Sequence, residues 1–163
     1  MNTIDTIKYS IRMADMIVQG YLGDLTQDEM MHRPCEGGNH ITWQLGHLLK
    51  STFGIAAGSM PTPLPELPEG FGDKYTKETA ASDNLEDFHT KEELMSLYNA
   101  QRDALIEGIE KLTEADMQKD APEHFKQIAT TAGEINAFQP LHWLMHVGQW
   151  AVIRRQLGRP PLF

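Results

Sequence analysis

The chain has 163 residues, and its 14 Lys and Arg against 23 Asp and Glu give a formal net charge of −9. This length suits one domain with its own apolar core, and the negative charge argues against binding to nucleic acid or to anionic membranes. The acidic start of the chain and the lack of a long apolar run predict neither a signal peptide nor a membrane span. We therefore expect a soluble cytoplasmic protein, and the single cysteine, Cys35, which cannot pair within the chain, fits a reducing compartment.

Two helices are predicted in the first third of the chain. Apolar residues recur every three or four positions over residues 3–23, the pattern of an amphipathic helix. Thr26 and Glu29 have the spacing of a capping box, so a short helical turn should follow. After a loop at residues 34–38, a second apolar pattern predicts a helix that begins after Asn39 as its N-cap.

Residues 59–89 differ in composition from the segments on either side. Prolines and glycines cluster there and exclude regular helix. They are Pro61, Pro63, Pro65, Pro68, Gly70 and Gly72. Neither flanking part has enough sequence for a core of its own. We therefore interpret this segment as a surface crossover within a single domain that spans residues 1–163.

Two further helices follow the crossover. Thr90 and Glu93 form a second capping box, and the apolar pattern behind them predicts a helix to about residue 112. The last helix should begin near Thr131, with Glu134 at capping spacing, and end before residues 158–161. Pro140 lies either inside this helix, where it would remove a backbone hydrogen bond, or at the start of a shorter helix.

These patterns together predict an all-α fold, a four-helix bundle with one long Pro-rich crossover loop and no sheet of consequence. A weak internal repeat adds one spatial prediction. Leu25, Thr26, Met30 and Pro34 recur as Leu112, Thr113, Met117 and Pro122. In this register His47 and His146 are equivalent, so a pseudo-symmetric bundle should bring them face to face; the alternative is that the similarity arose by chance.

His142 and His146 are four residues apart, so both imidazoles project from one face of the last helix. Gln139 and Gln149 lie in the same stripe, where buried polar groups are costly unless they are bonded. A metal ion would satisfy the two imidazoles, and His47 is the best candidate for a third ligand, since catalytic zinc commonly takes three protein ligands. The alternative is a pair of partly exposed histidines without a metal.

The remaining candidate ligands are less favourable. We expect His32, His40, His89 and His124 to be surface or capping residues. Cys35 would lie about 15–18 Å from His47 along the second helix, which argues against a role as a ligand.

The segments around these histidines resemble the DinB/YfiT-like metalloenzymes, and the resemblance spans nearly the whole chain. It is carried by GNHITWQLGHLL at 38–49, HWLMHVGQ at 142–149, Arg154-Arg155 and Leu157-Gly158. The resemblance implies a four-helix bundle with a histidine triad, one ligand from the second helix and a pair from the last. These positions correspond to His47, His142 and His146. The Pro-rich crossover departs from the family pattern at the entrance to the site.

Characterised DinB-like relatives include transferases and an isomerase that use low-molecular-weight thiols such as bacillithiol, mycothiol or glutathione. The resemblance therefore implies a metal-dependent thiol transferase that acts on a small-molecule substrate, and it also implies a homodimer. In this hypothesis Gln139 or Gln149 orients the ligands or the substrate.

Three neutral imidazoles leave a divalent metal its full charge, which stabilises a thiolate or lowers the pKa of a bound water towards about 7. Zn²⁺ is the ion we expect, with Ni²⁺ as the alternative. Two other functions stay open. One is metal-dependent hydrolysis, although the ligand helix offers no obvious carboxylate base; the other is a non-catalytic binding protein whose bundle the metal stabilises.

Overall fold

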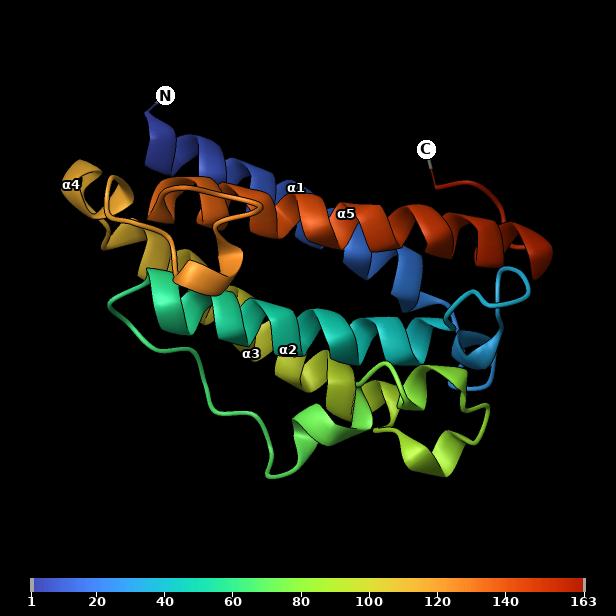
Figure 1. Cartoon of the computed structure of the whole chain (residues 1–163). Coiled ribbons are helices and arrows are strands. Elements are labelled where there is room, and N and C mark those ends of the chain that lie inside the picture. Colours follow the sequence, from blue (N-terminus) through green and yellow to red (C-terminus); the bar gives the residue numbers. More distant parts are fainter. Residues whose placement is uncertain (1, 163) are drawn as a thin grey trace.

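The computed structural model of this chain describes residues 2–162, which form helices joined by turns and loops (Figure 1). Four long helices form the bundle: α1 (Thr3–Gly23), α2 (Ile41–Ser59), α3 (Lys91–Glu110) and α5 (Ala132–Gln156). The connections contain a short helix, α4 (Glu114–Met117), and several 3₁₀ turns. The β-pairing within residues 2–162 is limited to one isolated bridge between Asp120 and Thr131. The predicted all-α four-helix bundle is thus confirmed.

The helices run in an up, down, down, up order (Figure 1). α1 and α5 lie side by side in the same direction, and α2 and α3 both run the opposite way. Since α2 and α3 are parallel, the chain must travel back along all 19 residues of α2, about 28 Å, before α3 begins. The Pro-rich segment makes this return, with 3₁₀ turns at Phe71–Lys74, Thr79–Ala81 and Leu85–Asp87. It is therefore the predicted crossover.

The capping boxes predicted from sequence spacing are present. Thr90 with Glu93 opens α3, and Thr131 with Glu134 opens α5, each pair exchanging side-chain and backbone hydrogen bonds. Thr26 and Glu29 make the same exchange, at 2.8 and 3.2 Å, before the 3₁₀ turn Glu29–Met31. These bonds satisfy backbone N–H groups that a helix start leaves unpaired, which explains why local spacing predicts the helix starts well.

The predicted N-cap of the second helix, Asn39, is wrong by one residue. His40 is the N-cap of α2, and its Nδ1 accepts a hydrogen bond from the backbone N–H of Trp43 at 3.0 Å. Its Nε2 lies 3.2 Å from the carbonyl oxygen of Ser82 in the crossover. The imidazole thus caps the helix and holds the crossover at once, which the shorter Asn side chain cannot do. His40 is a capping residue as expected, but it is fully buried rather than at the surface.

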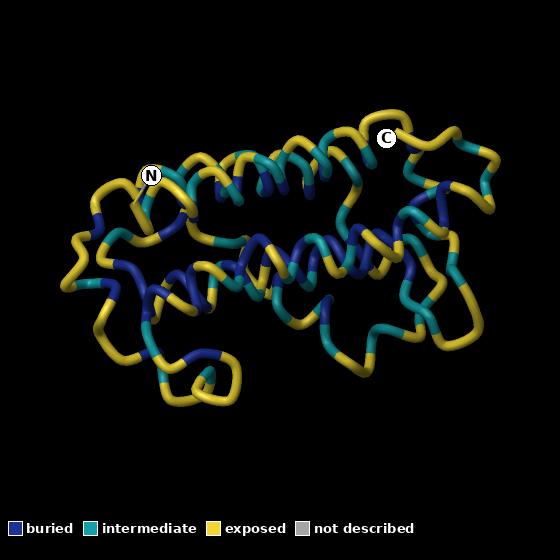
Figure 2. Tube along the Cα trace, turned by 90° about the horizontal axis from the view of Figure 1, so that it is seen from above, coloured by how far each residue is buried: buried dark blue, intermediate teal, exposed yellow. Residues whose placement is uncertain are grey.

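Each long helix turns a buried stripe inward and an exposed stripe outward (Figure 2). Pro140 lies inside α5, so the alternative of a shorter last helix is excluded. Trp143, Trp150 and Ile153 are buried behind it on the same helix. None of the helices within residues 2–162 combines the length and the apolar character that crossing a membrane requires.

Candidate metal centre

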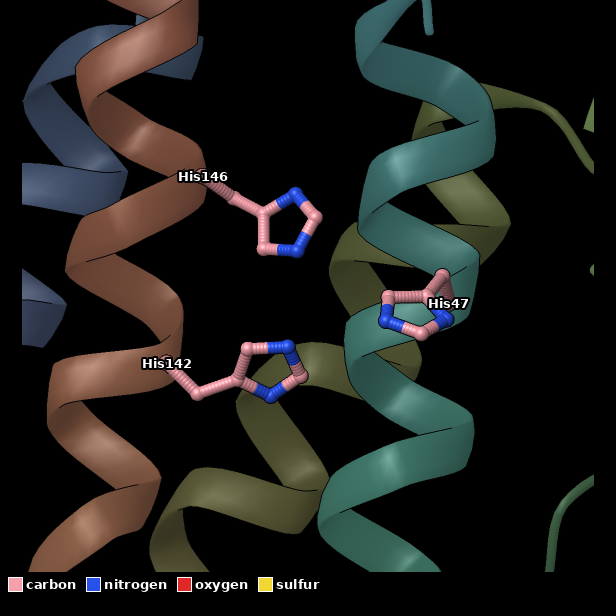
Figure 3. Close-up of side chains that lie close together, drawn as sticks. All are labelled: His47, His142 and His146. Atoms are coloured by element: carbon pink, nitrogen blue, oxygen red, sulfur yellow. The ribbon is translucent and has the colours of Figure 1, made fainter.

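Three histidines meet between α2 and α5 (Figure 3). His47 comes from the middle of α2, and His142 and His146 come from successive turns of α5. One side-chain nitrogen from each lies within 4.8 Å of the other two. The ring centres of His47 lie 5.4 Å from those of His142 and His146. The antiparallel packing of α2 on α5 therefore brings His47 and His146 face to face, as the internal repeat predicted.

The donor set fits a divalent metal ion. Nitrogens about 2.1 Å from one tetrahedral zinc ion lie about 3.4 Å apart. Small side-chain rotations that move the three nitrogens by about 1 Å would therefore bring them to this separation. All three side chains are partly buried, so the group is neither sealed in the core nor fully exposed. Among residues 2–162, His47, His142 and His146 are the group of histidine, cysteine and carboxylate side chains that could hold a metal ion.

The three imidazoles are neutral at pH 7. Burial, together with the neighbouring histidines, lowers the pKa of His142 and of His146 to about 4. Burial also lowers the pKa of His47, with a smaller contribution from the charge of Lys50. Because a protonated imidazole has no lone pair to donate, these low pKa values keep all three nitrogens available as ligands at neutral pH.

Gln44 on α2 sets the tautomer of His146. The indole N–H of Trp150 points at Gln44 Oε1 at 2.9 Å, and an indole nitrogen is only ever a donor, so this atom must be the amide oxygen. The same oxygen lies 2.9 Å from His146 Nδ1, which therefore carries the proton and donates it. Nε2 of His146 is left with its lone pair, as a metal ligand requires.

The two glutamines predicted to assist the site are placed differently. Gln149 is exposed, and its Oε1 accepts a hydrogen bond from Gln44 Nε2 at 3.2 Å, so it joins the site through Gln44. Gln139 is buried and donates from Nε2 to Asn136 Oδ1 at 2.9 Å, among groups that do not include the three histidines. Cys35, which we did not expect to be a ligand, is exposed in the loop before α2.

A surface cleft opens beside His47, walled by α2 and by the crossover. The ring of Trp43 stacks on His47, with the ring centres 5.1 Å apart. The charged and hydrogen-bonding side chains in the walls are Lys50, Ser51, Tyr75, Thr76, Lys77 and Glu78. Ser51 Oγ lies 3.4 Å from His142 Nδ1 and so links the cleft to a second histidine. The cleft supplies two ammonium groups and one carboxylate close to the candidate metal site.

Sequence reasoning missed Gln44 and the whole crossover wall. Gln44 could have been found because it is a polar residue in the mostly apolar first turns of α2. It lies three positions before His47, so the two side chains project from the same face of the helix. Tyr75 fits against α2 because residue 46 is glycine: a Cβ there would lie 2.1 Å from Tyr75 Cε1. That contact follows from the path of the crossover, which no periodic pattern specifies.

The fold and the site define a helical bundle with a three-histidine group that could hold a metal ion. A sequence model of the DinB superfamily, a group associated with metal binding, matches residues 11–150 and so includes all three histidines. The chain belongs to the DinB superfamily. Comparisons with curated proteins and with solved structures give no match.

Proposed function

We propose that this protein is a metal-dependent transferase in which His47, His142 and His146 hold one divalent ion and a low-molecular-weight thiol is the nucleophile. The observation that carries the proposal is the group of three neutral imidazoles within 4.8 Å of one another beside an accessible cleft. When bound, the metal would supply positive charge that stabilises a thiolate at neutral pH. We expect Zn²⁺, with Ni²⁺ as the alternative.

The charges of the cleft favour an anionic thiol. Lys50 and Lys77 line the same walls as His47, whereas Glu78 is the one carboxylate among the lining residues. This locally positive wall stands out in a chain with a net charge of −9. Carboxylate-bearing thiols such as glutathione or bacillithiol would be attracted to it, and nucleic acid would be repelled by the rest of the surface.

The proposed transfer requires few protein groups beyond these. The thiol loses its proton to water, its sulfur forms a bond to an electrophilic carbon of the small-molecule substrate, and the leaving group departs with the bonding electrons. Gln44 holds the ring of His146 in place, while Trp43 and Tyr75 shield the cleft beside His47. Gln149 supports Gln44 from the surface.

Hydrolysis is the second candidate, and Glu78 is the observation that favours it. The carboxylate of Glu78 lines the cleft with His47 and would be available as a general base. Hydrogen bonding to Thr76 lowers its pKa, so it is ionised at neutral pH. The third candidate is a binding protein without turnover, in which the metal only stabilises the bundle.

A cobalt titration distinguishes the three. Cobalt-loaded protein is titrated with glutathione, bacillithiol and mycothiol while the thiolate-to-cobalt charge-transfer band is followed, and the titration is repeated with His146→Ala. Transfer chemistry predicts a band with one thiol that disappears in the variant. No band with any thiol, combined with metal-dependent ester or amide cleavage that Glu78→Gln abolishes, would favour hydrolysis. The absence of both the charge-transfer band and the cleavage would favour the third candidate, a binding protein without turnover.

We also propose that the protein forms a homodimer. Apolar side chains on the outer face of α5 support this. Leu141, Met145 and Val152 are 56, 62 and 44% exposed and follow one another at helical spacing. An exposed apolar stripe of this kind on a long helix is typical of a surface that another subunit covers.

A further inference from the structure

The cleft beside His47 runs along α2. Its α2 wall comprises Trp43, His47, Lys50, Ser51 and Gly54, which recur every three or four positions and so share one face of the helix. From Trp43 to Gly54 this face is about 16 Å long. The cleft has a volume of about 570 Å³, a usual size for the binding site of an organic molecule.

The Trp43 end of the cleft is charged. The indole N–H of Trp43 donates to the backbone oxygen of Thr76 at 3.1 Å. This contact brings the next two residues of the crossover, a lysine and a glutamate that also line the cleft, to the same end. Lys50, further along α2, donates to the backbone oxygen of Gly72 at 2.9 Å, so its ammonium group is bonded to the crossover.

The Gly54 end is apolar. Phe125 lines the cleft there, because the loop between α4 and α5 packs against the C-terminal half of α2 (Figure 1). Phe125 and Phe138 of α5 pack against one small hydrophobic cluster. The ring of Phe138 stacks on His142, with the ring centres 5.5 Å apart. The apolar end therefore adjoins the histidine group.

Gly54 leaves open space at this end. The other two glycines of α2 are required by packing, because a Cβ at Gly46 would overlap Tyr75 and a Cβ at Gly58 would overlap Pro122. A Cβ at Gly54 would meet nothing within 4 Å. Glycine within a helix is less stable than alanine, and it allows another molecule to approach the backbone closely. Gly54 thus fits a position where a ligand lies against α2.

We propose that the Gly54 end of the cleft binds the electrophilic substrate, and that this substrate carries an uncharged apolar group such as a phenyl ring. The inference rests on the proposed function, in which the anionic thiol occupies the charged end. A charged group beside Phe125 would lose hydration without gaining a counter-charge. Because the two ends lie on opposite sides of His47 along α2, the thiol sulfur and the electrophilic carbon meet beside the histidines.

The direct test needs neither a thiol nor turnover. Benzyl alcohol and glycolate share a hydroxymethyl group, which carries a phenyl ring in the first and a carboxylate in the second. In heteronuclear NMR titrations of the unaltered protein, benzyl alcohol should shift the backbone amide signals of Gly54 and Phe125, and glycolate should leave both unchanged. Shifts by benzyl alcohol only elsewhere, or no shifts, would overturn the proposal.

Gly54→Leu should fill the site without disturbing the fold, since its side chain enters open space. The apparent Kd for benzyl alcohol should rise at least about 10-fold, while the metal content should stay that of the unaltered protein. Ala100→Leu, a similar enlargement at an exposed position of α3, is the control and should change neither quantity. Unchanged binding of benzyl alcohol to Gly54→Leu would refute the assignment of the site.

An activity assay separates this inference from the proposed function. Benzyl chloride and chloroacetate both react by attack of a thiolate sulfur on carbon, and chloride leaves with the bonding electrons. With the thiol that gives the cobalt band, acceleration over the uncatalysed reaction should be greater for benzyl chloride. Gly54→Leu should raise KM for benzyl chloride and not for the thiol. Binding of benzyl alcohol without any transfer would contradict only the proposed function, whereas transfer that prefers chloroacetate would contradict only the substrate class.

Discussion

Gln44 Oε1 accepts a hydrogen bond from His146 Nδ1 at 2.9 Å, across the interface between α2 and α5. Gln44 is fully buried, and its amide nitrogen is held by the backbone oxygen of Asn39 and the side chain of Gln149. The orientation of the amide is thus determined on both sides, and with it the nitrogen that His146 presents to the site.

Replacing Gln44 should therefore weaken metal binding. In Gln44→Met the Nδ1 proton of His146 loses its acceptor, so the ring can rotate or adopt the other tautomer. Metal affinity should fall about 10- to 100-fold, measured by competition with a chelator. Trp150→Phe is the matched control, because it removes the other donor to Gln44 and leaves the bond to His146 intact. Equal loss of affinity in both variants would indicate general loosening of the bundle instead.

The ligand assignment itself predicts a pattern of metal content. Purified, untagged protein should contain about one equivalent of a divalent transition metal by elemental analysis. His47→Ala and His146→Ala should each lose most of it, since two imidazoles hold a divalent ion far more weakly than three. Cys35→Ser should retain the metal, because Cys35 is exposed and outside the histidine group. Full loading of both histidine variants would refute the assignment.

The stability of the metal-free protein should depend on pH in a defined window. His40, His142 and His146 have a pKa of about 4 in the folded state, against about 6.5 in an unfolded chain. Between these values the unfolded chain binds more protons, so the free energy of unfolding falls as the pH drops through this range. Urea unfolding at pH 7.5 and 5.5, with a chelator present, measures this before most carboxylates titrate.

His40→Asn is the control for that experiment. Asn preserves an N-cap for α2 but removes one of the buried imidazoles, so the variant should lose part of the pH dependence. A free energy of unfolding that stays constant between pH 7.5 and 5.5 in the unaltered protein would contradict the low pKa values.

Gly46→Ala should destabilise the protein by about 1–3 kcal/mol. The added Cβ would lie 2.1 Å from Cε1 of Tyr75, a buried ring whose hydroxyl is bonded to His89. Gly54→Ala, in the same helix, meets nothing within 4 Å and should be neutral or stabilising by up to about 1 kcal/mol. Chemical unfolding of both variants measures the change in the free energy of unfolding. An equal change in the two variants would show that the Tyr75 ring moves aside at little cost.

The proposed dimer predicts a dimer mass by light scattering at micromolar concentration. Met145→Glu places a charge in the middle of the exposed apolar stripe of α5 and should produce monomers. Ile128→Glu changes a comparably exposed apolar residue, 54% exposed, in the loop before α5 and should remain dimeric. A monomeric unaltered protein would remove the proposal without affecting the fold.

The parts of the fold that local spacing determines were predicted well. Thr90 with Glu93 and Thr131 with Glu134 are bonded within one turn, so their positions in sequence are enough. His40 was missed as the N-cap because its advantage over Asn39 is a long-range contact to Ser82. The cap assignment thus depended on tertiary structure.

The candidate site divides in the same way. His142 and His146 could be paired from helical spacing alone, and the internal repeat placed His47 opposite them. Gln44 acts across 102 residues of sequence. Tyr75 and Glu78 line the cleft beside His47 only because the crossover folds back along α2. Residues that come together through an irregular segment carry no periodic signal.

The neighbouring positions of α1 and α5 have a consequence for biosynthesis. Arg154 of α5 binds the backbone oxygen of Tyr21 across 133 residues, and no two helices pack together more extensively among the described residues. During synthesis, the apolar stripe of α1 is therefore not covered by α5 until α5 has emerged from the ribosome. The same helix carries His142 and His146, so the three imidazoles cannot gather before α5 has been synthesised, and a product truncated before α5 retains His47 alone.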